Sequence, residues 1–146
     1  MPFTKDVLKI DRDAEAARIV GFIQDQLRAM HRKGIVIGLS GGVDSALSAA
    51  LSVKAAGKDR VLALLLPDKE SSPQSAEFAT KQAEKLGIEA VTVDITPVLE
   101  AFGTYEKRDA VARAIYPDFG GDHKLKITLP SDILNKDSFN FFTLTV

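Results

Sequence analysis

A segment of small and hydroxylated residues in the first third of the chain has the composition of an anion-binding loop. It reads Ser40-Gly41-Gly42-Val43-Asp44-Ser45 and joins the apolar run Ile35–Ile37 to an alanine-rich stretch that predicts a helix. A helix that begins directly after such a loop presents unpaired N–H groups and the positive end of its dipole to it. The glycines permit backbone angles that other residues resist, and the two serines add hydroxyl donors. The pattern therefore predicts a phosphate site.

Asp44 is the acidic residue of this loop. A carboxylate beside a phosphate repels it unless a cation lies between them, so we expect Asp44 to contact Mg²⁺. Neither common nucleotide motif accounts for the loop, because no lysine follows the glycines and G-x-G-x-x-G does not fit Gly38, Gly41 and Gly42. The alternative is a glycine turn that only closes a strand onto a helix, for which one glycine would suffice.

The hexapeptide resembles, at every position, the SGGxDS loop of the ATP pyrophosphatases, which cleave ATP between its α and β phosphates. Its flanks are similar to those of the NAD synthases, and this resemblance covers about residues 11–102. The flanking residues that carry it are Gly38 and Leu39 before the loop, and Leu66, Pro67, Ser71, Ser72 and Ser75 after the next apolar run.

The resemblance implies an AMP-forming amide ligase that uses ATP and Mg²⁺. ATP would adenylate the carboxylate of nicotinic acid adenine dinucleotide, pyrophosphate would leave into the loop, and ammonia would displace AMP to give NAD. The family also implies a homodimer. The residues implied for pyrophosphate and metal binding are Ser40, Gly41, Gly42, Val43, Asp44 and Ser45, with Ser40, Asp44 and Ser45 as the catalytic set; those implied for adenosine are Gly38, Leu39, Leu66 and Pro67.

Composition places the chain among soluble globular proteins. It has 146 residues, of which 45% are hydrophobic and 27% charged, and a net charge of −1, so nothing draws the whole chain toward nucleic acid or an anionic membrane. The longest apolar run, Val61–Leu66, is too short to span a bilayer, and the N-terminal segment lacks the apolar core of a signal peptide. We therefore expect a cytoplasmic protein. Because cysteine is absent, the chain lacks the nucleophile of a glutaminase and would use free ammonia or a separate subunit.

Alternating patterns predict an α/β fold: an open parallel sheet with helices on both faces, of the Rossmann-like type found in adenine nucleotide α-hydrolases. The carboxyl ends of parallel strands meet at one edge, where ligands bind. The loops 40–45, 67–72 and 94–97 should therefore lie together. The expected helices are 13–33, 45–56 and 72–87, and the expected strands are 35–37, 61–66 and 88–93.

We expect residues 1–146 to form a single domain in which 105–146 is a divergent, β-rich segment. A helical pattern spans 105–116, and 124–129 and 139–146 predict two strands. The N-x-x-x-R-x-R-M helix and the phosphate-binding lysine of NAD synthases are not found. A fragment of a longer enzyme explains both differences; a shortened relative and one subunit of a pair are the alternatives.

Two other functions remain open on the sequence alone. One is a noncatalytic adenine-nucleotide-binding module that keeps the loop but lacks an acceptor site. The other is a sulfur-transfer ATP pyrophosphatase that takes its sulfur from elsewhere, since the chain has no thiol of its own. Formation of AMP that depends on nicotinic acid adenine dinucleotide would separate the amide ligase from both.

Overall fold

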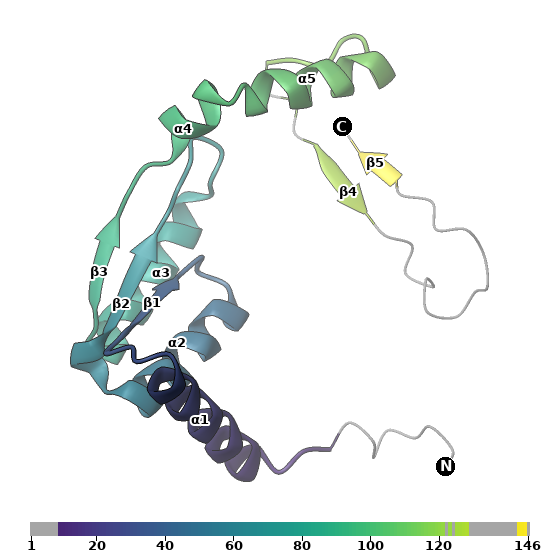
Figure 1. Cartoon of the computed structure of the whole chain (residues 1–146). Helices are drawn as coiled ribbons and strands as arrows, with labels where there is room; N and C mark the ends of the chain where they lie inside the picture. The colour runs from purple at the N-terminus through teal and green to yellow at the C-terminus, as the bar shows by residue number, and fades with distance from the viewer. Residues whose placement is uncertain (1–8, 122, 124, 129–142, 146) are drawn as a thin grey trace. The chain divides into compact units, whose positions relative to one another are not determined.

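The computed structural model describes residues 9–121, 123, 125–128 and 143–145, and the chain divides into two compact units (Figure 1). Unit 1 is Met1–Thr96 and unit 2 is Pro97–Val146. Among the described residues, no helix combines the length and the apolar character needed to cross a membrane.

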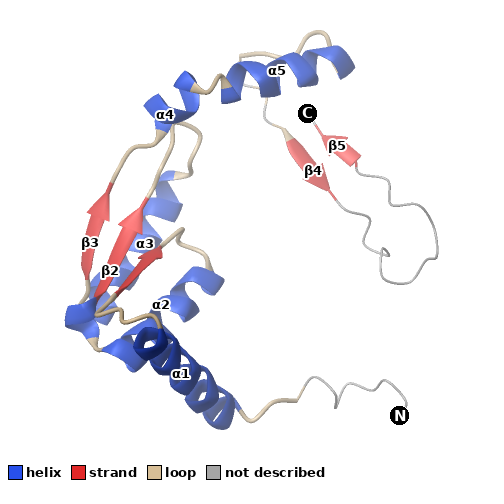
Figure 2. Ribbon diagram, in the orientation of Figure 1, coloured by secondary structure: helices blue, strands red, loops and turns tan. Residues whose placement is uncertain are grey.

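Unit 1 is a three-stranded parallel sheet with helices (Figure 2), so the α/β class and the parallel order expected from the sequence are confirmed. Strand β2 is central, and the register aligns Ile37 with Ala63 and Ala63 with Ala90. The elements of unit 1 are α1 (Arg12–Ala29), β1 (Ile35–Gly38), α2 (Val43–Ala56), the 3₁₀ turn Lys58–Arg60, β2 (Val61–Leu65), α3 (Pro73–Leu86) and β3 (Glu89–Thr92).

The core lies between one face of the sheet and helices α2 and α3. Alternate residues of β2 are buried against these helices, which contribute small side chains at the contact, so the helices lie close to the strands. Its buried members are Leu39, Ala49, Ala56, Val61, Ala63, Leu65, Ala79, Ala83 and Ile88.

The opposite face of the sheet has no helix layer among the described residues of unit 1, although the sequence analysis expects helices on both faces. Both crossovers, β1–α2–β2 and β2–α3–β3, advance in the same direction across the sheet. Because crossovers of one hand that run in one direction put their helices on the same side, α2 and α3 share a face.

Helix α1 begins one residue before the predicted start and ends four residues before the predicted end. It stops at Ala29 rather than Lys33, because His31 adopts a φ of +53° and the N–H of Arg32 turns back to the carbonyl of Leu27 at 2.9 Å. Helices α2 and α3 also end at residues with positive φ, Gly57 and Gly87.

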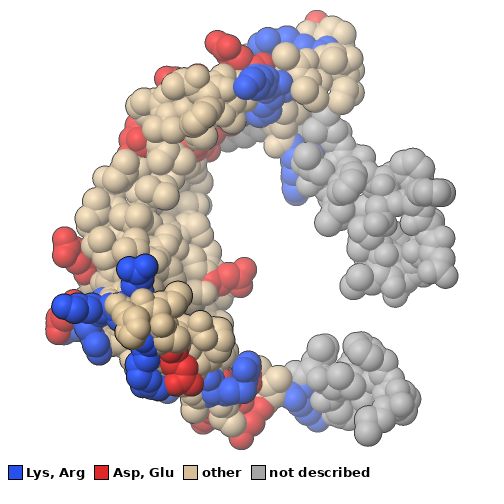
Figure 3. Space-filling view, viewed as in Figure 1, with Lys and Arg blue, Asp and Glu red and all other residues tan. Residues whose placement is uncertain are grey.

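Basic side chains gather where these three helices end, at the amino-terminal edge of the sheet (Figure 3). Cations at helix C-termini offset the negative ends of the helix dipoles. The interaction of these basic side chains with the helix dipoles therefore stabilises the helix ends, which is a structural role. The residues are Arg32, Lys33, Lys58 and Arg60.

An aspartate before the apolar stripe, Asp11 or Asp13, is a predicted cap of α1, and the structure selects Asp11: its Oδ1 accepts hydrogen bonds from the N–H groups of Asp13 and Ala14, each at 3.1 Å. We expect Asp11→Ala to lower the free energy of unfolding by about 1 kcal/mol, because two N–H groups of the first turn lose their acceptor. Asp25→Ala, which removes only an exposed ion pair with Arg28, should cost less than about 0.5 kcal/mol. Denaturant unfolding of both variants measures this, and equal costs would contradict the capping role.

Unit 2 contains the expected helix α5 (Thr104–Ile115) and an antiparallel pair of β4 (Lys126–Thr128) and β5 (Thr143–Thr145). The connection 129–142 lies outside the described residues. A short helix that the sequence analysis does not expect, α4 (Thr96–Ala101), begins at the boundary between the units. The guanidinium Nε of Arg113, in the last turn of α5, donates to the carbonyl of Phe119 at 3.0 Å and fixes the turn that follows the helix.

Candidate nucleotide site

The loop between β1 and α2 is held at the carboxyl-terminal edge of the sheet by its first residue. Leu39 is buried, and its N–H donates to the carbonyl of Leu64 at 2.9 Å, which extends the ladder between β1 and β2. Helix α2 then begins at Val43 after Gly42, two residues earlier than predicted, and no side chain caps it. Its first N–H groups therefore have no capping side chain and face the loop.

Ser40 and Ser45 are brought together by the turn. Their Oγ atoms lie 3.1 Å apart, and the Oγ of Ser45 donates to the carbonyl of Gly42 at 3.0 Å. The N–H of Ser40 also points at the Oγ of Ser45, at 3.3 Å. Both hydroxyls thus lie beside the first turn of α2. The Ser40 hydroxyl can donate to a phosphate there, and the Ser45 hydroxyl can do so in place of its bond to the carbonyl of Gly42.

The two glycines of the loop have different roles. Gly41 has a φ of +81°, and a Cβ at this position would lie 2.3 Å from the carbonyl oxygen of Ser75 on α3. Gly42 has a φ of −85°, which any residue can adopt, and its added Cβ would meet only the Oγ of Ser40, at 3.4 Å. The sequence predicts unusual backbone angles at both glycines, but only Gly41 adopts one.

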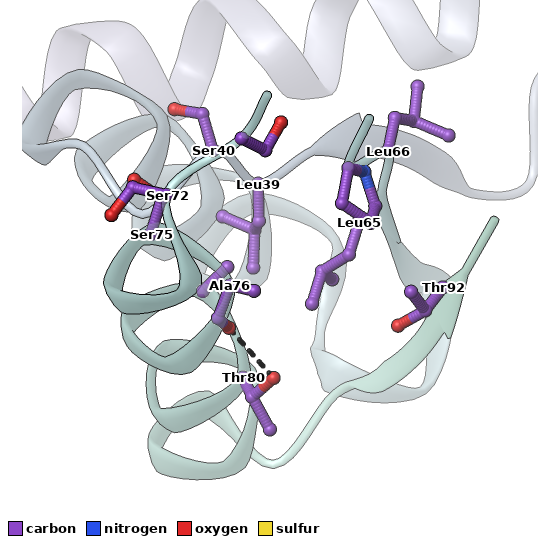
Figure 4. A pocket seen from close by; sticks show the side chains of 12 residues that line it. Leu39, Ser40, Leu65, Leu66, Ser72, Ser75, Ala76, Thr80 and Thr92 are labelled. Atoms are coloured by element: carbon purple, nitrogen blue, oxygen red, sulfur yellow. Dashed lines mark hydrogen bonds between the residues drawn. The ribbon is translucent and has the colours of Figure 1, made fainter. Parts of the chain in front are cut away.

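Beside the loop lies a pocket of about 250 Å³, formed by the ends of β1 and β2 and the first turns of α3 (Figure 4). Four of the predicted site residues line it, together with the serines that carry the resemblance. Its lining is Leu39, Ser40, Leu65, Leu66, Pro67, Ser71, Ser72, Ser75, Ala76, Ala79, Thr80 and Thr92.

The other predicted residues, Gly38 and 41–45, do not line the pocket; 41–45 form the loop and helix start next to Ser40. Sequence reasoning missed the roles of Ala76, Thr80 and Thr92. The helical periodicity of α3 predicts that Ala76 is buried, whereas the structure leaves it exposed beside the pocket. Nothing in the local pattern marks either threonine.

The chemistry of the pocket suits a nucleoside more than a charged group. Leucine, proline and alanine side chains supply apolar walls, and its polar groups are mostly hydroxyls, such as that of Thr80, which donates to the carbonyl of Ala76 at 3.0 Å (Figure 4). Its volume is just below the usual 300–1,000 Å³ of ligand pockets, enough for a base and part of a sugar. Phosphates attached to such a ligand would extend toward Ser40 and the loop.

The loops after β2 and β3 add negative charge to this edge. Asp68 accepts a hydrogen bond from the Oγ of Ser71 at 2.6 Å and does not line the pocket. Hydrogen bonds from the side chain and backbone of Thr96 hold the pKa of Asp94 below its usual value, against opposition from burial and from the Asp68 carboxylate. Asp94 is ionised at neutral pH, so its carboxylate cannot donate to a phosphate.

Asp44 lies exposed in the first turn of α2. No cluster of three or more His, Cys, Asp or Glu residues suited to a metal occurs among the described residues. A single carboxylate still fits Mg²⁺, because this ion keeps several waters and is commonly held by one or two carboxylates together with substrate phosphates. Asp44 and the phosphates of a nucleotide would together hold the ion.

Comparisons with known proteins agree with this arrangement. The sequence model of the NAD synthase family matches residues 15–116. An ammonia-dependent NAD⁺ synthetase of Rhizobium meliloti (strain 1021) is 44% identical over 144 residues, which cover 99% of this chain and 43% of the relative. The likeness therefore continues past Phe102, where the sequence analysis ends it.

Two solved structures have similar folds. NMN synthetase from Francisella tularensis is 34% identical with a TM-score of 0.61, over 68% of this chain and 41% of that protein. A glutamine-dependent NAD⁺ synthetase from Acinetobacter baumannii, in complex with ADP, is 31% identical with a TM-score of 0.56, over 73% and 18%. The chain thus spans less than half the length of these relatives. With a family match over most of its length, the chain belongs to the NAD synthase family.

Proposed function

We propose that this chain binds ATP with Mg²⁺ for the AMP-forming amidation of nicotinic acid adenine dinucleotide by ammonia, either as an NAD synthase or as the ATP-binding part of one. One observation carries the proposal. At one edge of the sheet, the uncapped start of α2 and the hydroxyls of Ser40 and Ser45 lie next to an apolar pocket. The ADP complex of the Acinetobacter protein and the ammonia dependence of the Rhizobium relative support it.

In the proposed first step, a carboxylate oxygen of the dinucleotide attacks the α-phosphorus of ATP, and the bond to the bridging oxygen of the β-phosphate breaks. Pyrophosphate leaves with the bond electrons. The hydroxyls of Ser40 and Ser45 and the first N–H groups of α2 stabilise that charge. Asp44 would hold Mg²⁺, which would supply further positive charge there. Val43 supplies the first N–H group within α2.

In the second step, ammonia attacks the adenylated carbonyl carbon, AMP leaves, and one proton is released. Adenosine is held by Leu39, Leu66 and Pro67 in the pocket, and Gly38 ends β1 directly before Leu39. A cytoplasmic location and a homodimer belong to the same proposal. Family membership gives no support to sulfur transfer.

The proposal is tested by calorimetric titration with Mg-ATP, followed by assay of pyrophosphate release. Release that requires both ammonia and nicotinic acid adenine dinucleotide is expected of a competent synthase. Release that requires nicotinic acid mononucleotide in place of the dinucleotide would indicate an NMN synthetase, as in the Francisella protein. Binding without release would support an ATP-binding part or a noncatalytic module, and no binding would refute the nucleotide site.

A change of Ala76 to phenylalanine tests the adenosine pocket separately. The added ring fills the space beside Leu39 and Ala79, so we expect at least a tenfold loss of ATP affinity with pyrophosphate affinity unchanged. Glu77→Phe is the matched control, because the Glu77 side chain is 57% exposed and pairs with Lys81 outside the pocket. Equal ATP affinities in the two variants would show that the base binds elsewhere.

A further inference from the structure

Two threonines of the nucleotide pocket lie away from the phosphate loop. Thr80 belongs to α3 and Thr92 is the last residue of β3, and both line the pocket. In Figure 4 their side chains are at one end of the pocket, whereas Ser40 of the β1–α2 loop is at the other. A nucleotide whose phosphates bind the loop would therefore reach the threonines with its base.

The hydrogen bond that Thr80 makes within α3 decides what its hydroxyl can offer a ligand. The Oγ1 atom donates to the carbonyl oxygen of Ala76, one turn earlier in the helix, at 3.0 Å. Because a carbonyl oxygen can only accept, the hydroxyl hydrogen lies in this bond, and the lone pairs of Oγ1 remain for the pocket. Thr80 therefore presents an acceptor to the base and keeps no donor.

The hydroxyl of Thr92 is not committed in this way. Within the part of the chain that the structure describes, it has no hydrogen-bond partner, so it can donate or accept. The two threonines together offer one fixed acceptor and one adjustable group. The edge of adenine is complementary to this pair, because its N6 amino group donates and its N1 accepts, whereas a 6-oxopurine presents the acceptor O6 in place of the amino group.

We propose that Thr80 is a specificity-determining residue that selects a 6-aminopurine: its Oγ1 accepts from the N6 amino group, and the Thr92 hydroxyl donates to N1. A 6-oxopurine would place O6 against a second acceptor unless Thr80 broke its bond to Ala76. Buried sites of this kind reject analogues by about 10⁴–10⁵-fold, but Thr80 is exposed and water competes, so about tenfold is expected here. This selection rests on the proposed function, because the base is read only if ATP occupies the pocket.

The test compares calorimetric titrations with the Mg²⁺ complexes of ATP, inosine triphosphate and purine riboside triphosphate, the last of which has no group at position 6. Thr80→Val keeps the shape of the side chain and removes the acceptor, whereas Thr80→Ser keeps the hydroxyl. Ser52→Ala is the matched control, because Ser52 donates to the carbonyl of Ser48 at 2.8 Å, the same type of bond in α2, and does not line the pocket. Such bonds do not stabilise a helix, so all three variants should fold.

We expect the native chain to bind ATP about tenfold more tightly than either analogue, and the three affinities to lie within about threefold of one another in Thr80→Val. Thr80→Ser and Ser52→Ala should keep the native preference. Equal affinities in the native chain, or an unchanged preference in Thr80→Val, would overturn the role of Thr80 while ATP binding itself upheld the proposed function. Absence of binding by all three nucleotides would refute the nucleotide site and the selection with it.

Discussion

Replacement of Gly41 by alanine should abolish detectable Mg-ATP binding and lower the free energy of unfolding by about 2–4 kcal/mol. The φ of +81° is costly for any residue with a Cβ, and the new methyl group would lie 2.3 Å from the carbonyl oxygen of Ser75. Because the backbone fixes the position of the Cβ and its neighbour is a backbone oxygen, no rotation of a side chain relieves the overlap. The loop must move away from α3, which separates Ser40 and α2 from the pocket.

Gly42→Ala is the matched control for this prediction. Its φ of −85° is ordinary, and its added Cβ would contact only the Oγ of Ser40, at 3.4 Å. We expect a change in unfolding free energy of less than about 1 kcal/mol and ATP affinity within a few-fold of the native chain. Calorimetry and denaturant unfolding compare the pair. If both variants bind ATP equally well, the contact between the loop and α3 does not shape the site.

Asp44→Ala should weaken ATP binding in the presence of Mg²⁺ by roughly 30- to 150-fold, equivalent to about 2–3 kcal/mol. The carboxylate is exposed in the first turn of α2, so the fold should lose no more than the dipole interaction of about 0.3–1 kcal/mol. Without Mg²⁺ the sign should reverse: the variant should bind ATP as well as the native chain or better, because a negative charge beside the phosphates has been removed.

Asp59→Ala serves as the control, because Asp59 is an exposed carboxylate in the turn before β2, at the opposite edge of the sheet. Its ATP affinity should equal that of the native chain with and without Mg²⁺. Titrations with and without the metal, for both variants, give the complete comparison. An unchanged dependence on Mg²⁺ in Asp44→Ala would remove this residue from the metal site.

The sequence by itself determined the features that depend on neighbouring residues. Asp11 precedes a helix and caps it, and Pro73 stands at the first position of α3. The hexapeptide 40–45 indicates a phosphate loop because glycine, hydroxyl and helix start are adjacent along the chain. Apolar runs separated by helical patterns likewise imply a parallel sheet, since consecutive parallel strands need crossovers.

Tertiary structure decided the features that depend on packing between elements. Gly41 rather than Gly42 lacks room for a Cβ because α3 lies against the loop, and the pocket brings together Thr80 of α3 and Thr92 of β3, which lie far apart along the chain. The position of α2 and α3 on one face of the sheet follows from two crossovers in one direction. Local patterns fix hydrogen bonds and backbone angles over a few residues, whereas these features depend on distances between segments that are set only when the sheet and helices pack.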